Sequence, residues 1–192
     1  MLAAVLLAAG AATRYGADKL MVTLADGRPI LAAAIDALSP HVGCVVGVVG
    51  PQHRARAELL RARGCRVATC QQAAAGMGHS LAAGIAALPV CTDYLVALGD
   101  MPWLQAETVA QVVQYSRDNA SSVIIAPRFQ GRRGHPILFR GTLRAQLLAL
   151  EGDQGARAMM ERHAAQIRYC EVEDAGILRD VDRPEDLIGL SI

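Results

Sequence analysis

The chain has 192 residues, a formal net charge of +1 and 53% hydrophobic residues. This length predicts a single domain over residues 1–192, with ample material for a packed core. A net charge so near zero gives no electrostatic reason to expect a nucleic acid as partner. No apolar run approaches the ~20 residues that span a bilayer, so we expect no membrane partner and a cytoplasmic protein.

The apolar run over residues 2–8 stands where a secretion signal would stand. No basic region precedes it, and Arg14 and Lys19 follow at once. We therefore interpret it as a buried strand.

Short apolar runs alternate with helical patterns through the first two thirds of the chain. The runs are rich in Val, Ile and Leu, as in parallel strands that are buried on both faces. Their alternation with helices predicts an α/β fold with a doubly wound sheet. Expected strands cover 2–8, 42–49, 65–70, 94–98 and 121–126, and expected helices cover 29–38, 52–63, 79–88 and 105–118.

The pattern changes after residue 127. Gln130-Gly131 predicts a turn between two strands, and therefore a hairpin. We expect helices over 141–149 and 154–164, a strand over 167–172 and a short helix that begins at Pro184. No internal repeat and no linker divides the domain.

Five cysteines are scattered along the chain without a Cys-x-x-Cys pair. An odd, scattered set argues against a disulfide framework and against a zinc site. Cys65 and Cys70 would point to opposite faces of one strand. We expect buried thiols that act as small apolar side chains.

The stretch LLAAGAATRYGADKL, residues 6–20, places two glycines and two cations directly after the first strand. Gly10 and Gly16 permit a tight turn whose backbone N–H groups face an anion. The spacing matches neither the Walker pattern nor Gly-x-Gly-x-x-Gly. One interpretation is a phosphate-binding loop with Arg14 and Lys19; the other is a plain turn with both cations in solvent.

Three aspartates stand where a metal site can form. Asp100 follows the strand over 94–98, at the edge where open α/β sheets bind ligands. Asp180 and Asp182 are two apart, so in an extended segment both carboxylates point the same way, and either can join Asp100. Carboxylate oxygens suit a Mg²⁺ ion that carries a nucleotide's phosphates. Each aspartate can also serve as a turn or cap residue, Asp182 above all, because a helix start follows it.

Taken in chain order, these motifs resemble the MobA-like nucleotidyltransferases, and most closely the molybdenum cofactor cytidylyltransferases. The opening pattern of that family is Leu-Ala-Ala-Gly-x-x-x-Arg-apolar-Gly-x-x-Lys, and its metal motif is similar to residues 99–102, GDMP. GRRGHPILF (131–139), GDQGAR (152–157) and DVDRPEDL (180–187) also resemble family segments. The similarity extends from residue 2 to residue 187. The opening pattern is matched by Leu7, Ala8, Ala9, Gly10, Arg14, Tyr15, Gly16 and Lys19.

The resemblance implies a Rossmann-like three-layer fold with a mostly parallel mixed sheet. It implies transfer of CMP from CTP to the terminal phosphate of the molybdopterin-bound metal cofactor, which gives the cytosine dinucleotide cofactor and pyrophosphate. Mg²⁺ or Mn²⁺ would be bound by Asp100 and Asp182. Arg14, Lys19 and Asp100 would be catalytic, and the nucleotide would contact Leu7, Ala8, Ala9, Gly10, Gly16, Ser80, Gly84 and Gly99.

Two further regions suit the base and the acceptor of such a reaction. Small residues over 71–84 permit a close backbone approach, and Ser80 offers a hydroxyl at a helix start, where it can also serve as a cap. For the acceptor we expect His135 and Arg157 to contribute, because a pterin phosphate needs donors of this kind. We also expect Asp153 there, since it stands between Gly152 and Gly155 in the same segment as Arg157. His135 lies within an arginine-rich region that contains Arg128, Arg132, Arg133, Arg140 and Arg144.

Three alternatives stay open. Guanylyl transfer from GTP is favoured by Asp18, since the guanylyl branch of the family has Asp-Lys at this place, whereas Ala9 favours the cytidylyl branch. Transfer to a sugar phosphate is a second alternative, although such enzymes commonly carry proline before the loop lysine. A third is a carrier without catalysis that delivers the cofactor to a molybdoenzyme; a cytidylyltransferase would also contact that recipient transiently.

Overall fold

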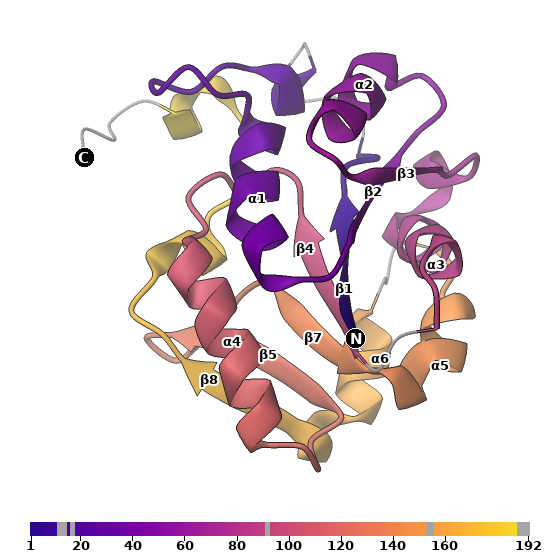
Figure 1. Ribbon diagram of the computed structural model, residues 1–192, viewed down its shortest axis with the longest axis vertical. Helices are drawn as coiled ribbons and strands as arrows, with labels where there is room; N and C mark the ends of the chain where they lie inside the picture. The colour runs from indigo at the N-terminus through magenta and orange to yellow at the C-terminus, as the bar shows by residue number, and fades with distance from the viewer. Residues whose placement is uncertain (11–14, 16–17, 91–92, 153–155, 188–192) are drawn as a thin grey trace.

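A single sheet runs through the molecule, with helices on both of its faces (Figure 1). The structure is a computed structural model that describes residues 1–10, 15, 18–90, 93–152 and 156–187. In this part of the chain the strands follow the order β3-β2-β1-β4-β7-β5-β6, and β8 pairs with β5. The strands are β1 (Leu2–Leu7), β2 (Val45–Val49), β3 (Arg66–Thr69), β4 (Asp93–Leu98), β5 (Ile124–Phe129), β6 (Arg132–Arg133), β7 (Ile137–Arg140) and β8 (Ile167–Glu171).

The two faces of the sheet carry two separate apolar cores. One core lies under α1, α2 and α4, and the other lies under α3, α5 and α6. In α4 the buried positions Val109, Val112, Val113 and Ser116 follow the helical spacing that turns one stripe toward the sheet. The helices are α1 (Ile30–Leu38), α2 (Arg54–Ala62), α3 (Met77–Ala87), α4 (Ala106–Asp118), α5 (Arg144–Leu148) and α6 (Arg157–Arg162).

This architecture confirms the predicted α/β class and the Rossmann-like three-layer arrangement. Strands β1 to β4 are mutually parallel, whereas β7 lies antiparallel between β4 and β5. The predicted hairpin is also confirmed: β5 and β6 pair across Gln130 and Gly131, which both have positive φ, at 49° and 77°. The helix expected from Pro184 is a short 3₁₀ turn, Pro184–Leu187.

The cysteines of the described residues behave as apolar side chains. Cys44, Cys65, Cys70 and Cys170 are free thiols. Cys65 lies in the core under α1 and Cys70 in the core under α3, so the two point to opposite faces as predicted. Within the same residues, none of the helices combines the length and the apolar character needed to cross a bilayer.

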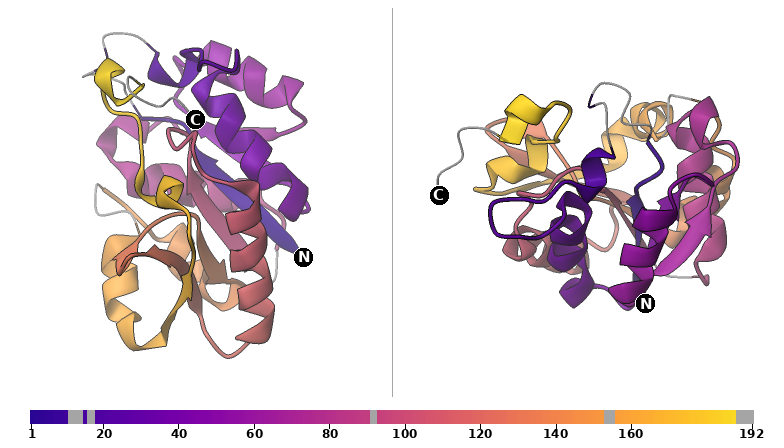
Figure 2. Two further views of the ribbon diagram at one scale, coloured as in Figure 1. Left: turned by 90° about the vertical axis from the view of Figure 1, so that its left-hand side faces the viewer. Right: turned by 90° about the horizontal axis from the view of Figure 1, so that it is seen from above.

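Strand register brings the first loop beside Asp100. Leu7 at the end of β1 pairs with Leu98 at the end of β4, and the Gly99 amide donates to the Leu7 carbonyl at 2.9 Å. The segment after β8 returns to the same edge, where the Val181 amide donates to the Asp100 carbonyl at 2.9 Å. Figure 2 shows this C-terminal segment and the segment around Lys19 at the same end of the molecule. Residues 18–19, 100 and 180–182 are thereby gathered at one place.

Candidate functional site

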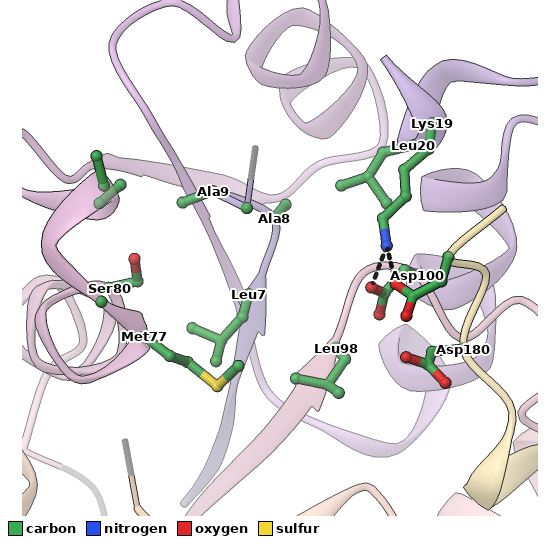
Figure 3. Close-up of a pocket in the computed structure, with 15 residues that line it drawn as sticks. Leu7, Ala8, Ala9, Lys19, Leu20, Met77, Ser80, Leu98, Asp100 and Asp180 are labelled. Carbon is green, nitrogen blue, oxygen red and sulfur yellow. Dashed lines mark hydrogen bonds and ion pairs between the residues drawn. The ribbon is translucent and has the colours of Figure 1, made fainter. Parts of the chain in front are cut away.

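A cavity of about 550 Å³ opens at the carboxyl ends of β1 and β4. Acidic side chains and Lys19 stand on one side of it, and Met77 and Ser80 of α3 stand on the other (Figure 3). The end of β1 passes between the two sides. The lining residues are Leu7, Ala8, Ala9, Gly10, Lys19, Leu20, Ala73, Ala74, Gly76, Met77, Ser80, Leu98, Asp100, Asp180 and Asp182.

Lys19 connects the first loop to the acidic side of the cavity. Its Nζ donates to Asp100 Oδ2 at 2.9 Å, to Asp182 Oδ1 at 3.2 Å and to the Val181 carbonyl at 2.6 Å. Burial by itself would lower the pKa of Lys19, but the hydrogen bonds and charges of Asp100 and Asp182 together raise it above its ordinary value. Lys19 is therefore a fixed cation at neutral pH, and it is the only lysine in the sequence.

Asp100, Asp180 and Asp182 form a cluster in which one carboxylate oxygen of each lies within 4.8 Å of the others. Burial raises the pKa of Asp180, and the charges of Asp100 and Asp182 raise it further. Such repulsion among carboxylates is relieved by a bound cation. The sequence suggested that either Asp180 or Asp182 could join Asp100, and the structure brings both beside it.

The donor set fits a divalent metal ion. Within the described residues, Asp100 Oδ1 is a buried side-chain oxygen without a hydrogen-bond partner. A buried carboxylate oxygen of this kind is costly unless a ligand engages it. Three carboxylates offer the hard oxygen ligands that Mg²⁺ and Mn²⁺ prefer.

The other side of the cavity is built from small residues and the first turn of α3. Gly76 has φ of 132°, which residues with a side chain rarely adopt, and it allows the chain to turn sharply into α3. Ser80 is 4% exposed and lines the cavity from this helix. Ala73 and Ala74 contribute only methyl groups to the wall, beside the larger side chain of Met77. This side offers an apolar surface with a single hydroxyl, suited to a flat base.

Gly84 and Gly99, which the sequence suggested for the nucleotide, lie outside the cavity lining. A Cβ on Gly84 would stand 2.5 Å from Val5 Cγ1 and 2.8 Å from Val48 Cγ2. The absence of a side chain at Gly84 thus serves the packing of α3 on the sheet. Gly99 lies against the Leu7 carbonyl and the Leu31 side chain, so it serves the junction of β1 and β4.

Of the residues that the sequence suggested for the acceptor, the structure describes His135 and Arg157, and neither lines the cavity. His135 is half-buried, with Nδ1 3.5 Å from the Val96 carbonyl, and burial lowers the pKa of its ring, which is therefore neutral. The charge of Asp100 acts in the opposite direction and raises the pKa of the His135 ring. Arg157 is exposed and pairs with Glu161 at 3.1 Å on α6. Arg14, Gly16 and Asp153 lie outside the described residues.

The arginines around the hairpin divide into structural and exposed groups. Arg140 pairs with Asp93 at 2.7 Å, and Arg144 donates to the Ile85 carbonyl and the Tyr94 hydroxyl, so both hold the fold together. Arg128 pairs with Glu171 across β5 and β8. Arg132 and Arg133 are exposed on β6.

Two buried charged residues support the site, and the sequence did not reveal either. Arg56 on α2 is 1% exposed and contacts the first loop. Asp174 is 2% exposed and accepts from the Gln105 amide at 3.1 Å, the Thr108 hydroxyl at 2.8 Å and the Gly176 amide at 2.7 Å. Asp174 thus ties the start of α4 to the segment that carries Asp180 and Asp182.

Asp174→Ala is expected to lower the free energy of unfolding by about 2–3 kcal/mol, because it removes a helix cap and leaves three donors unpaired. Urea denaturation measures this change. Glu173→Ala, at the exposed neighbouring residue, is the control and should leave stability unchanged. An Asp174→Ala protein as stable as the wild type would contradict the assigned contacts.

Comparison with known proteins agrees with this geometry. The family described as the MobA-like NTP transferase domain matches residues 4–167. The nicotine blue oxidoreductase of Paenarthrobacter nicotinovorans is 31% identical, over 97% of this chain and 94% of the relative. The purine catabolism protein PucB of Bacillus subtilis is 29% identical, over 95% of this chain and 92% of its own.

Solved structures show the same fold. Rv0371c of Mycobacterium tuberculosis H37Rv has a TM-score of 0.76 and 27% identity, covering 96% of this chain and 94% of its own. A structure of Rv0371c in complex with manganese has a TM-score of 0.67 and 25% identity, with coverage of 89% and 88%. The fold extends to the molybdopterin-guanine dinucleotide biosynthesis protein A of Archaeoglobus fulgidus, with a TM-score of 0.71, 20% identity and coverage of 97% and 95%. With its phosphate-loop pattern, its acidic cluster and this match over most of its length, the chain belongs to the MobA-like NTP transferase family.

Proposed function

We propose that the protein transfers CMP from CTP to the terminal phosphate of the molybdopterin-bound metal cofactor and releases pyrophosphate. The observation that carries this proposal is the convergence of the β1 end, Lys19 and three aspartates on one cavity. A metal-bound triphosphate needs a cation, oxygen ligands and a close backbone approach, and this cavity combines all three.

The reaction itself requires no general base. An oxygen of the acceptor phosphate attacks the α-phosphorus of CTP, and the bond from that phosphorus to the oxygen bridging to the β-phosphorus breaks. A phosphomonoester is already anionic at neutral pH, because its second pKa is about 6. Catalysis then depends on alignment and on compensation of charge. Lys19 supplies a permanent positive charge for the leaving pyrophosphate, and we assign the same role to Arg14.

Asp100, Asp180 and Asp182 would hold Mg²⁺ or Mn²⁺. When bound, the ion neutralises and orients phosphate oxygens. The manganese complex of Rv0371c, a similar protein, supports this assignment.

The choice of CTP rests on the resemblance through Ala9, which lines the cavity. Asp18, which favoured the guanylyl branch, has another explanation in this fold: its carboxylate binds Arg56 at 2.8 Å. Asp18 thus serves the shape of the loop, and its presence is not an argument for GTP.

The acceptor side is proposed to include His135, Asp153 and Arg157. Gly78 at the start of α3 donates to the Gly152 carbonyl at 2.9 Å, so the segment that leads to Asp153 lies against the helix that borders the cavity. His135 lies between β6 and β7, and the charge of Asp100 acts to raise the pKa of its ring against the larger effect of burial. A transient contact with a recipient molybdoenzyme would follow transfer. A carrier without catalysis would not need the Lys19 and aspartate cluster.

The test offers CTP, GTP, ATP and UTP in turn to the purified protein with Mg²⁺ or Mn²⁺ and metal-loaded molybdopterin. We expect the cytosine dinucleotide and pyrophosphate as products, with kcat/KM for CTP at least about tenfold above that for GTP, a difference of about 1.4 kcal/mol. Preference for GTP would establish guanylyl transfer instead. Binding of the cofactor without turnover of any nucleotide would favour the carrier.

A further inference from the structure

Arg56 reaches from the first turn of α2 to both ends of the first loop. Its Nη1 donates to the Ala8 carbonyl at 2.6 Å and to the Gly10 carbonyl at 2.9 Å. Its Nε donates to Asp18 Oδ1 at 2.8 Å. One guanidinium therefore joins the residues that enter the loop to the residue that precedes Lys19.

This arginine is buried at 1% exposure, which is unusual for a residue of this kind. The burial is tolerated because an aspartate accepts from Nε and two carbonyls accept from Nη1. His53 Nδ1 lies 3.4 Å from Nη1 and 3.2 Å from the Gly50 amide. Burial and the charge of Arg56 lower the pKa of His53, which favours the neutral ring, and its Nδ1 can then accept from the Gly50 amide. A lysine has no planar fork and cannot reproduce this set of bonds.

The contacts of Arg56 bear directly on the residues of the cavity. Ala8, Gly10 and Lys19 all line the cavity, and Asp18 directly precedes Lys19 in the chain. Arg56 also binds the Ala8 and Gly10 carbonyl oxygens, whose partial negative charge would repel a polyphosphate. Arg56 therefore affects the binding of only that part of a ligand that lies against the loop and Lys19.

We propose that Arg56 is a positioning residue for the triphosphate of the nucleotide, acting through Ala8, Gly10, Asp18 and Lys19 without touching the substrate. This inference rests on the proposed nucleotidyl transfer. It goes further in assigning a role to a side chain that lies outside the cavity. It also explains why an acidic residue precedes the loop lysine in this chain.

The test compares binding of CTP and of CMP, both with Mg²⁺, by isothermal titration calorimetry. In Arg56→Gln we expect Kd for CTP to rise about tenfold, equivalent to about 1.4 kcal/mol, while Kd for CMP changes little, because CMP lacks the two phosphates that meet the positioned groups. In turnover assays KM for CTP should rise together with Kd, and Arg56→Lys should recover only part of the loss. Arg54→Gln is the matched control, since Arg54 lies on the same helix and is 89% exposed.

Asp18→Asn removes only the negative charge that pairs with Arg56 at the loop exit, and it shows the effect if Arg56→Gln fails to fold. It should weaken the binding of CTP more than the binding of CMP, as we expect for Arg56→Gln. A folded Arg56→Gln or Asp18→Asn protein that binds CTP as tightly as the wild type would overturn the inference. Equal weakening of CTP binding and CMP binding would also overturn the inference, because such a result would indicate a purely structural role for Arg56. If the wild type binds none of the four nucleoside triphosphates, the proposed function fails and this inference fails with it.

Discussion

Replacement of Asp100 by asparagine is expected to lower kcat by about 10²–10³-fold while the protein stays folded. Asp100 Oδ2 binds Lys19 at 2.9 Å, and its buried Oδ1 has no hydrogen-bond partner among the described residues. The amide preserves the shape of the side chain but removes the charge that a divalent ion requires. Single-turnover assays with CTP and metal-loaded molybdopterin measure the effect.

Two further measurements separate this loss from a folding defect. Asp118→Asn, at the exposed end of α4, should keep wild-type turnover. Binding of the molybdopterin cofactor to Asp100→Asn, followed by fluorescence of Trp103, should be largely retained. Wild-type turnover by Asp100→Asn would show that the acidic cluster does not serve the reaction.

Replacement of Lys19 by glutamine is expected to have opposite effects on metal binding and on turnover. The ammonium lies 2.9 Å from Asp100 and 3.2 Å from Asp182, where it opposes a second cation. Without it, Mn²⁺ alone should bind about tenfold more tightly, since a like charge is removed. Turnover should fall by about 10²–10³-fold, because the leaving pyrophosphate loses its fixed cation. Electron paramagnetic resonance of free Mn²⁺ measures the first effect and pyrophosphate release the second.

Lys19→Arg is the matched control because it keeps the charge, and its affinity for Mn²⁺ should stay near that of the wild type. A Lys19→Gln protein that loses Mn²⁺ affinity together with activity would contradict the expected repulsion between Lys19 and the metal ion.

The raised pKa of Lys19 adds an independent check. Since Lys19 is the only lysine, an amine-selective reagent at mildly alkaline pH should modify its protonated side chain slowly, and Asp100→Asn should accelerate the modification.

The sequence predicted the parts of the site that follow local rules. Parallel strands end at one edge of a sheet, so the glycine loop after β1 and Asp100 after β4 were expected together. The alternation of Asp180 and Asp182 in an extended segment likewise brought both toward Asp100. The hairpin followed from Gln130-Gly131, whose positive φ values suit a tight turn.

The features of the fold and the site that the sequence did not predict depend on contacts between residues far apart in the chain. The burial of Arg56 depends on Asp18 and Ala8, which lie 38 and 48 positions away. Its only local signal is its spacing of four from the buried Leu60, which places both on the inner face of α2. The sequence suggested Gly84 as a nucleotide-binding residue because glycine permits a close approach. In the structure the groups that lie close to Gly84 are side chains of the sheet. The position of β7 between β4 and β5 is likewise a property of the assembled sheet.

The proposed reaction requires that one polyphosphate and one divalent cation bind together where the β1 loop faces the acidic cluster. A crystal of the protein with Mn²⁺ and a non-hydrolysable CTP analogue, examined by anomalous scattering, tests this directly. We expect the manganese signal at the carboxylates of Asp100, Asp180 and Asp182, with the triphosphate between that ion and the Gly10 to Lys19 loop. Manganese or nucleotide bound elsewhere, with Lys19 still paired to Asp100 and Asp182, would contradict the proposed site.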